Sequence, residues 1–202
     1  MVGIVNYGMG NLGSIQNMLK KIGVPSLILN DALELDKVTK LILPGVGAFD
    51  NGILELRKSK WIETLNHLVL QEKMPILGIC LGMQLMTNKS EEGNEAGLGW
   101  INAETVKFRF EDNQLKIPHM GWNIVTPTTE SSLFNLAYEE LRFYHVHSYY
   151  VKLKDPTDEI AVTNYGTPFT CAFRKENIWG VQFHPEKSHK FGMEMFRNFS
   201  NI

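Results

Sequence analysis

A cysteine with a glycine two positions away on either side is the residue in this sequence best suited to nucleophilic chemistry. The segment Gly78-Ile79-Cys80-Leu81-Gly82 stands where an apolar run ends and a helical pattern begins, which is the nucleophile-elbow pattern with cysteine in place of serine. Glycine removes side chains that would collide with Cys80 on so tight a turn. The following helix favours the reactive thiolate, and the Leu81 amide can hold an oxyanion. A core cysteine with chance glycines is the alternative that so short a motif leaves open.

A cysteine nucleophile needs a base and a group that orients the base. His184 closes the apolar run Ile178–Phe183 and is followed by Pro185 and Glu186. Parallel-sheet folds build sites at strand ends. Pro185 biases His184 toward extended backbone, in which residues two apart project to the same side, so Glu186 can reach the imidazole. A solvated surface turn is the alternative, but together with Cys80 we interpret the three as nucleophile, base and orienting group.

The second cysteine and the other histidines have simpler interpretations. Cys171 lies inside the strand pattern Phe169–Phe173 with no elbow around it, so we expect a core position. His145 and His147 lie on one face of a strand, and two such imidazoles can bind zinc only with a third ligand. Because no Cys or Asp/Glu cluster offers that ligand, we expect no metal.

Two glycine-rich loops follow strands in the first half of the chain. In Pro44-Gly45-Val46-Gly47, glycines on both sides of a valine allow the backbone to turn an amide toward a ligand, as a second oxyanion donor opposite Leu81. A plain strand-to-helix loop is the alternative. The loop Gly8–Gly13 fits G-x-G-x-x-G and has Asp31 after the next strand, which matches a dinucleotide fingerprint. That pattern is weak alone, and the cysteine chemistry needs no cofactor.

The elements that must position these residues follow two patterns. In the first half, short apolar runs alternate with helical periodicity, which is typical of a parallel sheet covered on both faces. The runs are Val2–Asn6, Ser26–Leu29, Leu41–Leu43 and Pro75–Ile79; the helices are Ser14–Ile22, Ile53–Leu70 with a break near Ser59, and one from Gly82. In the second half, strand patterns follow one another without helices, which implies an antiparallel extension. These are Trp100–Phe110, Phe143–Val151, Ile160–Asn164, Phe169–Phe173 and Ile178–Phe183, before a last helix over Ser188–Phe199.

Composition narrows the function classes. The chain has 202 residues, 44% hydrophobic and 21% charged, with 20 basic against 22 acidic side chains. This balance gives no electrostatic reason to expect nucleic acid or an anionic membrane as partner. The longest nearly apolar run, Pro75–Met86, is too short to span a bilayer. Two cysteines do not form a disulfide framework. We therefore expect a single cytoplasmic domain over residues 1–202.

Four segments, in order along nearly the whole chain, resemble the class I (triad) glutamine amidotransferases. The second and fourth are shared by the wider class, and the third is the more specific mark of the branch formed by the glutaminase subunits of imidazole glycerol phosphate synthase. The segments are Pro44–Gly47, Cys80–Gln84, Pro118–Asn123 and His184–Ser188. The resemblance implies an α/β, flavodoxin-like fold with an open, mostly parallel sheet flanked by helices and an antiparallel extension.

The resemblance also implies roles for individual residues. Cys80 attacks the glutamine amide and forms a thioester, while His184, oriented by Glu186, protonates the ammonia and activates water. The amides of Leu81 and Val46 hold the oxyanion, and in this family the second donor, here Val46, turns inward only when the partner is engaged. The positions that match glutamine-binding residues are Gly47, Gln84, Glu92, Ser148 and Tyr149. Those that match partner-facing residues are Asn11, Trp122 and Lys187.

A partner follows from the chemistry as well. Ammonia released into water takes a proton and stops being a nucleophile, so it must pass directly to an acceptor site. A 202-residue glutaminase fold leaves no room for a synthase domain. The resemblance implies a (β/α)8 cyclase subunit as partner and imidazole glycerol phosphate, in histidine biosynthesis, as a joint product.

Three alternatives remain open at this point. Paralogous subunits supply ammonia for amination of a sugar in surface-polysaccharide synthesis, and His145 stands where the family usually has an apolar or aromatic residue. A cysteine hydrolase or peptidase could use the same elbow without a partner. A non-enzymatic binding subunit could retain the fold, although an intact triad argues against it.

Overall fold

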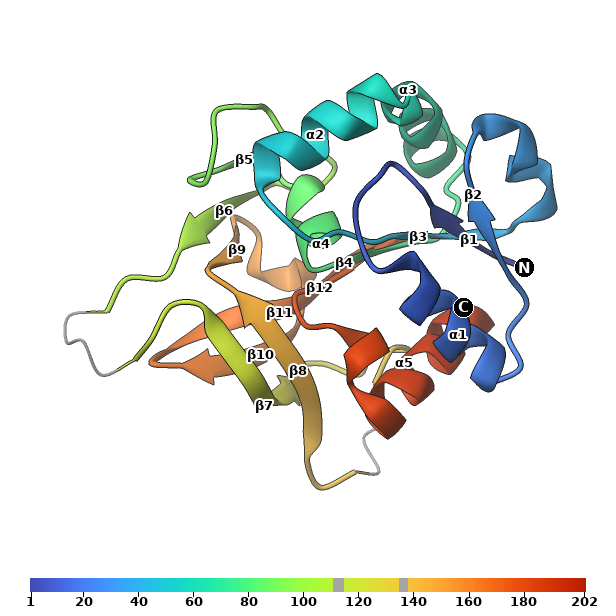
Figure 1. Cartoon of the computed structure of the whole chain (residues 1–202). Coiled ribbons are helices and arrows are strands. Elements are labelled where there is room, and N and C mark those ends of the chain that lie inside the picture. Colours follow the sequence, from blue (N-terminus) through green and yellow to red (C-terminus); the bar gives the residue numbers. More distant parts are fainter. Residues whose placement is uncertain (111–114, 135–137) are drawn as a thin grey trace.

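The first half of the chain folds into alternating strands and helices, as the apolar pattern predicts (Figure 1). The computed structural model describes residues 1–110, 115–134 and 138–202. The strands are β1 (Val2–Val5), β2 (Ser26–Leu29), β3 (Lys40–Leu43) and β4 (Ile76–Ile79). The helices are α1 (Leu12–Lys21), α2 (Phe49–Lys58), α3 (Trp61–Asn66) and α4 (Leu81–Leu85), with a 3-10 segment η1 (Ala32–Lys37) and a π-type turn η2 (His67–Gln71).

These strands form the parallel part of the sheet, in the order β2-β1-β3-β4-β12. Strand β12 (Ile178–Val181) comes from near the C-terminus and pairs in parallel with β4, with Val181 opposite Ile79. Two catalytic candidates from distant parts of the sequence therefore leave neighbouring strands at the same edge of the sheet, where parallel-sheet folds place their sites.

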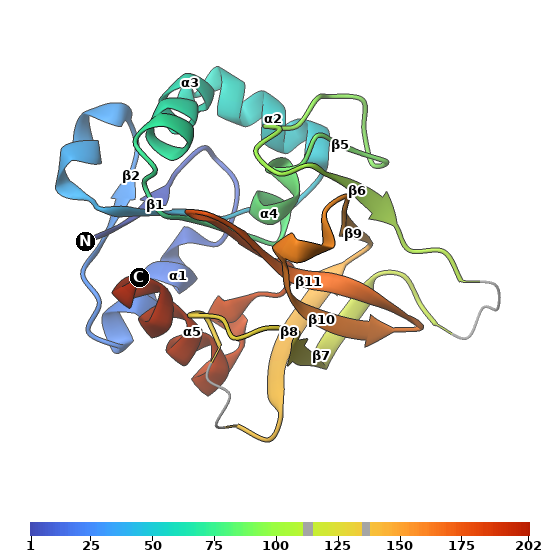
Figure 2. The ribbon, with the colours of Figure 1, turned by 180° about the vertical axis from the view of Figure 1, so that it is seen from behind.

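Helices cover both faces of the parallel strands (Figures 1 and 2). Helices α2, α3 and α4 lie on one face, and α1 and α5 (His189–Asn201) lie on the other. Adjacent strand residues serve opposite faces: Ile4 packs in the core that contains Phe196, and Val5 packs in the core that contains Trp61. Burial on both faces explains why these strands are unbroken apolar runs.

The second half adds antiparallel strands, as expected. After β12 the sheet continues β11-β10-β7-β8, and β9 also pairs with β11 and leads to β6 and β5. The strands are β5 (Lys89–Ser90), β6 (Ala103–Lys107), β7 (His119–Pro127), β8 (Leu141–His147), β9 (Tyr149–Leu153), β10 (Glu159–Tyr165) and β11 (Thr167–Lys175). Two 3-10 turns complete the elements, η3 (Pro156–Asp158) and η4 (Pro185–Lys187).

One strand prediction in this half was wrong, and one strand was missed. The run Phe143–Val151, predicted as one strand, divides at Ser148 into β8, which pairs with β7, and β9, which pairs with β6 and β11. Strand β7 was not predicted. Its apolar residues alternate on the exposed face, and Gly121 has φ +128°, so the stretch lacks the pattern of a buried strand.

The predicted break in the second helical region is confirmed, and it generates a stability prediction. Exposed Lys60 separates α2 from α3 in the left-handed region, at φ 60° and ψ 24°.

Lys60→Gly should raise the free energy of unfolding by about 0.5–1 kcal/mol. Glycine avoids the Cβ penalty of this conformation, and that gain is larger than the extra chain entropy that glycine loses on folding. Urea unfolding measures the change. Lys20→Gly, inside α1, should instead lower it by about 1 kcal/mol; a loss at both positions would contradict the strain argument.

Candidate functional site

Cys80 occupies a strained turn between β4 and α4. Its φ of 53° and ψ of −109° lie outside the regions that L-residues favour, and such outliers gather at active sites. A Cβ on Gly82 would lie 1.9 Å from the Leu43 carbonyl oxygen, and one on Gly78 would lie 2.8 Å from the Gly82 carbonyl oxygen. The two glycines of the motif are thus required by close backbone packing, as the sequence predicts.

His184 and Glu186 form a buried pair. The distance from His184 Nδ1 to Glu186 Oε1 is 2.8 Å, and the side chains are 1% and 2% exposed. The backbone route differs from the expectation: His184 is extended, but Pro185–Lys187 is a 3-10 turn, so Glu186 reaches the imidazole by turning back rather than along an extended chain. The His184 backbone amide donates to the Tyr144 carbonyl at 2.8 Å, which anchors the base to β8.

The charge state of His184 suits a pairing with a sulfur anion. Burial alone would lower its pKa, but Cys80 and Glu186 outweigh burial and raise the pKa of His184 to about 10. Its Nε2 atom is buried and makes no hydrogen bond in this structure. Because Cys80 helps to raise this pKa, the imidazole interacts electrostatically with the sulfur, although the Nε2 hydrogen bond is not well aligned, as is common at resting active sites.

Cys80 and His184 open into one cavity of about 440 Å³. The cavity brings together the predicted oxyanion residues and every residue predicted to contact glutamine. Its lining includes Val46, Gly47, Leu81, Gln84, Glu92, Ser148, Tyr149 and Lys187. The predicted partner-facing residues Asn11 and Trp122 do not line it.

Gln182 contacts the nucleophile and was missed by the sequence analysis. Its Nε2 atom lies 3.7 Å from Cys80 Sγ, and its Oε1 accepts from Gln84 Nε2 at 3.0 Å. Gln84 Nε2 also donates to the Tyr149 carbonyl at 3.1 Å, so the amide nitrogen of this predicted glutamine-binding residue is engaged within the protein. The available signal was a polar amide that interrupts the apolar run two residues before His184; the structure shows that it is fully buried.

The loop that contains Val46 is held on both sides but leaves Val46 itself exposed. Val46 is 44% exposed, between Gly45 and Gly47, and Gly47 has φ +112°. A Cβ on Gly45 would lie 2.7 Å from the Gly82 amide nitrogen. The loop therefore packs directly on the nucleophile turn, with a glycine on either side of the candidate oxyanion donor.

The G-x-G-x-x-G loop has a structural explanation. Gly8 and Gly10 have φ of +85° and +96°, and a Cβ on Gly10 would lie 2.9 Å from Pro44 Cβ. Asn11 Oδ1 accepts from the Ser14 amide at 3.3 Å and caps α1. The glycines let this loop turn and contact the Val46 loop, which accounts for the pattern without a nucleotide.

An exposed apolar row lies on β7 near the cavity. Met120, Trp122 and Ile124 are 61%, 47% and 41% exposed, and they project to the same side of the strand. Trp122 stacks on His189 with ring centroids 5.5 Å apart. Lys187, in the cavity wall, places Nζ 5.7 Å from the centre of the Tyr144 ring.

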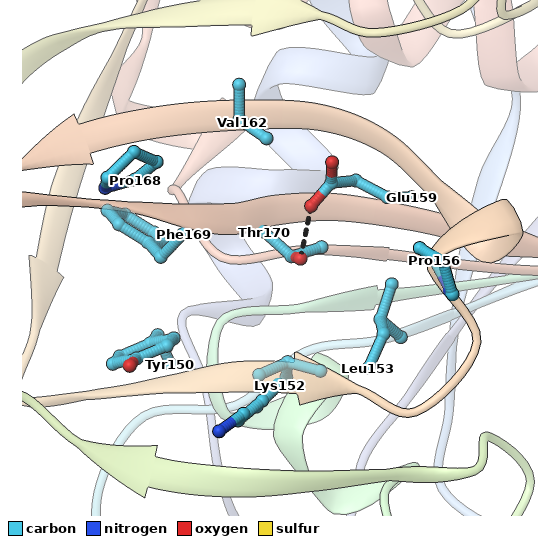
Figure 3. A pocket seen from close by; sticks show the side chains of 10 residues that line it. Tyr150, Lys152, Leu153, Pro156, Glu159, Val162, Pro168, Phe169 and Thr170 are labelled. Carbon is cyan, nitrogen blue, oxygen red and sulfur yellow. Dashed lines mark hydrogen bonds between the residues drawn. The ribbon is translucent and has the colours of Figure 1, made fainter.

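A second hollow lies elsewhere on the antiparallel strands and lacks catalytic chemistry (Figure 3). It has a volume of about 320 Å³ and is lined by residues from β9, β10 and β11, among them Tyr150, Pro168 and Glu159. Thr170 Oγ1 donates to Glu159 Oε2 at 2.5 Å, so this carboxylate is already bonded. The described residues that line this hollow include neither a cysteine nor a histidine.

A third histidine lies beside His145 and His147, contrary to the expectation that no third metal ligand is available. His119, on β7, lies beside His145 and His147, and one nitrogen of each imidazole lies within 4.8 Å of the others. The expectation that no third ligand is available was wrong because it considered cysteine and carboxylates and did not foresee that β7 pairs with β8.

Comparison with known proteins places the chain in a family. Residues 4–201 match the family model for class-I glutamine amidotransferases. The chain is 55% identical to the protein named imidazole glycerol phosphate synthase subunit HisH 2 of Methanococcus maripaludis, covering 98% of both chains. It is 47% identical to the protein of the same name in Pseudomonas aeruginosa, covering 100% of both.

Solved structures share the fold. A crystal structure described as a glutamine amidotransferase has a TM-score of 0.76 at 16% identity, covering 100% of this chain and 99% of that one. The structure of PurLQS from Thermotoga maritima gives 0.75 at 17% identity, covering 99% and 97%. No helix in the described residues is long and apolar enough to cross a membrane. With its elbow cysteine, buried His–Glu pair and family match from residue 4 to residue 201, the chain belongs to the class I glutamine amidotransferases.

Proposed function

We propose that this protein hydrolyses glutamine to glutamate and ammonia and passes the ammonia to a synthase partner. The observation that carries the proposal is that Cys80, on a strained turn, and His184, paired with Glu186, open into the same cavity. The cavity is large enough to bury an amino acid, and the family match supplies the reaction class. We propose one amidotransferase domain working in the cytoplasm, where a free thiol persists.

In the proposed mechanism the Cys80 sulfur attacks the side-chain amide carbon of glutamine. The C–N bond breaks while His184 gives its proton to the leaving nitrogen, so that ammonia departs and a glutamyl thioester remains. His184, now neutral, takes a proton from water, and the hydroxide adds to the thioester carbon. The C–S bond then breaks, glutamate leaves, and the thiolate and imidazolium are restored. Glu186 fixes the imidazole tautomer and stabilises its charge.

The oxyanion of each tetrahedral intermediate would lie between two backbone amides. Leu81 follows the nucleophile directly, and Val46 lies on the loop packed against the same turn. We propose that Val46 turns inward when the partner is bound, since glycines on both sides permit the required peptide rotation. Gly47, Gln84, Glu92, Ser148 and Tyr149 would hold glutamine. Gln182 would support Gln84 by accepting a hydrogen bond from its Nε2.

The proposed partner is a (β/α)8 cyclase subunit that forms a heterodimer with this chain. The relatives are named as subunits of imidazole glycerol phosphate synthase, and ammonia must reach its acceptor without meeting water. The exposed row on β7, with Trp122, lies near the cavity wall that contains Lys187. We propose that this face, with Asn11, meets the partner, and that the product serves histidine biosynthesis.

A sugar-aminating pathway is the second candidate. The observation that favours it is His145, which is fully buried. At this position the family that the sequence resembles usually has an apolar or aromatic side chain. The chemistry at Cys80 would be the same and only the ammonia acceptor would differ. Rescue of a histidine auxotroph lacking its own subunit distinguishes the two: growth supports histidine biosynthesis, and failure with a stable, soluble protein supports the second candidate.

Cys80→Ala should abolish glutamine hydrolysis and leave the fold and partner binding intact, because only the nucleophile is removed. Synthesis by the complex with added ammonium salt should continue, which a coupled product assay measures. Cys171→Ala, at the other buried cysteine, should retain glutaminase activity. Loss of the ammonium-dependent reaction in Cys80→Ala would show a structural role for this residue instead.

Glu186→Gln should lower kcat for glutamine by about 10²–10⁴ with a small change in KM, because the amide no longer fixes the imidazole tautomer. Glu186 helps to raise the pKa of His184 to about 10. The imidazolium exists below that pKa. Glu186→Gln should lower the pKa of His184 and so move the alkaline limb of the pH–kcat profile to lower pH. Glu91→Gln, which alters a surface carboxylate paired with Arg109, is the control. An unshifted limb would contradict the assigned role.

Trp122→Ala and Lys187→Ala should each weaken assembly with the cyclase subunit by about 10-fold or more, as expected for central aromatic and cationic interface residues. Glutaminase activity at saturating partner should fall less than the affinity does. Titration calorimetry measures the affinity. Leu33→Ala changes a side chain that is 86% exposed on η1 and should leave binding unchanged. Equal affinities for all three variants would rule out this face.

A further inference from the structure

Three buried histidines from two neighbouring strands converge beside the catalytic cavity. His119 is directly opposite His147 in the β7–β8 ladder, and His145 is opposite Gly121, which has no side chain. The three side chains are 3%, 0% and 6% exposed in the order His119, His145 and His147. We call them the histidine cluster.

Two of the three distances between inward nitrogens in the histidine cluster are close to those of metal ligands, and all three nitrogens lie within 4.8 Å of one another. His119 Nδ1 lies 3.1 Å from His147 Nε2, and His145 Nδ1 lies 3.2 Å from the same atom. Imidazole nitrogens bound to tetrahedral zinc at about 2.0–2.1 Å are separated from one another by roughly 3.3–3.4 Å. A small shift of the rings would therefore complete such a site.

Hydrogen bonds in the histidine cluster leave one imidazole without a complementary partner. His147 Nδ1 donates to the Tyr149 carbonyl at 2.8 Å, so its Nε2 presents a lone pair inward. Asn123 Nδ2 donates to His119 Nε2 at 3.1 Å, so His119 Nδ1 carries the proton that faces this lone pair. His145 Nδ1 points at the same, already occupied lone pair, and its buried Nε2 has no partner. A buried polar group in this position needs an explanation.

All three imidazoles are buried, and burial disfavours the charged form of the ring. Neutral imidazole is the form that coordinates metals. A metal ion forms bonds with all three inward nitrogens, whereas a proton can satisfy only one.

We propose that His119, His145 and His147 bind one divalent transition-metal ion of the zinc class. Imidazole donors and tetrahedral spacing select this class over Mg²⁺ and Ca²⁺, which prefer oxygen. The Tyr149 carbonyl already holds the outer nitrogen of His147, as is usual for metal-bound histidines. On binding, His119 moves its proton to Nε2, and the Asn123 carboxamide must turn and give up its bonds to the Asn164 carbonyl and the Ile124 amide so that its oxygen accepts that proton.

The surroundings give the ion an access path and a consequence. His147 also lines the catalytic cavity, so an ion and a fourth, water ligand can arrive from that side. An ion held by both strands would fasten β7 to β8. These strands contain the exposed Trp122 face and the carbonyl that anchors His184. We expect metal binding to stabilise this part of the fold.

The test is a titration of metal-free, full-length protein with Zn²⁺ and Co²⁺. It uses the Cys80→Ala background, because a thiolate–imidazole pair can itself bind zinc. We expect one equivalent to bind, with visible bands of tetrahedral Co²⁺ and no thiolate-to-cobalt band. The melting temperature should rise by about 5 °C or more at 100 times Kd. Absence of binding, or a thiolate band, would overturn the proposal.

Variants locate the ion. His145→Phe and His119→Gln should each weaken Zn²⁺ binding on the order of 100-fold, since each removes one of three protein ligands. His67→Ala removes a surface imidazole that contacts Glu72 and should change nothing. Metal-free His145→Phe should melt no lower than its parent, because it removes a buried unpartnered nitrogen. Undiminished binding in both cluster variants would place the ion elsewhere and refute the assignment.

Discussion

The parallel pairing of β4 with β12 is the constraint on which the site depends. It aligns Ile79 with Val181, and the Cys80 amide donates to the Val181 carbonyl at 2.8 Å. Two segments separated by about half the chain thus end at the same sheet edge, one in the nucleophile and the other, after a short extension, in the base. Without this pairing the sulfur and the imidazole would have no common cavity.

Keeping Cys80 at a positive φ requires that the surrounding backbone be packed tightly enough to prevent relaxation. Gly82 presses against the Leu43 carbonyl and Gly45 against the Gly82 amide, so the strained turn is enclosed by the ends of β3 and α4. Strain of about 1–3 kcal/mol persists only where neighbours over-determine the conformation. The same contacts place the Val46 loop at the nucleophile, so the packing that holds the strain also positions the second candidate oxyanion donor.

The sequence was informative where a residue type had one physical explanation. Glycines around Cys80, unbroken apolar strands and the His-Pro-Glu order predicted the elbow, the parallel sheet and the buried pair. It was less informative where function depends on pairing between strands. Strand β7 exposes its apolar residues and was missed, and with it the contact of His119 with His147. Gln182 was missed because an isolated buried amide becomes meaningful only when β12 brings it to Cys80.

Strand β8 connects the proposed partner face with the catalytic base. Tyr144 accepts a hydrogen bond from the His184 amide, and its own amide donates to Ser188 Oγ at 3.0 Å, while Ser188 Oγ donates to the His184 carbonyl at 2.6 Å. The backbone of His184 is therefore fixed on both sides to β8, whose ladder partner β7 exposes Trp122. A displacement of β7 by a docked protein would reach the base through main-chain hydrogen bonds rather than through flexible side chains. The proposed partner face and the backbone of the base therefore belong to one hydrogen-bonded strand network.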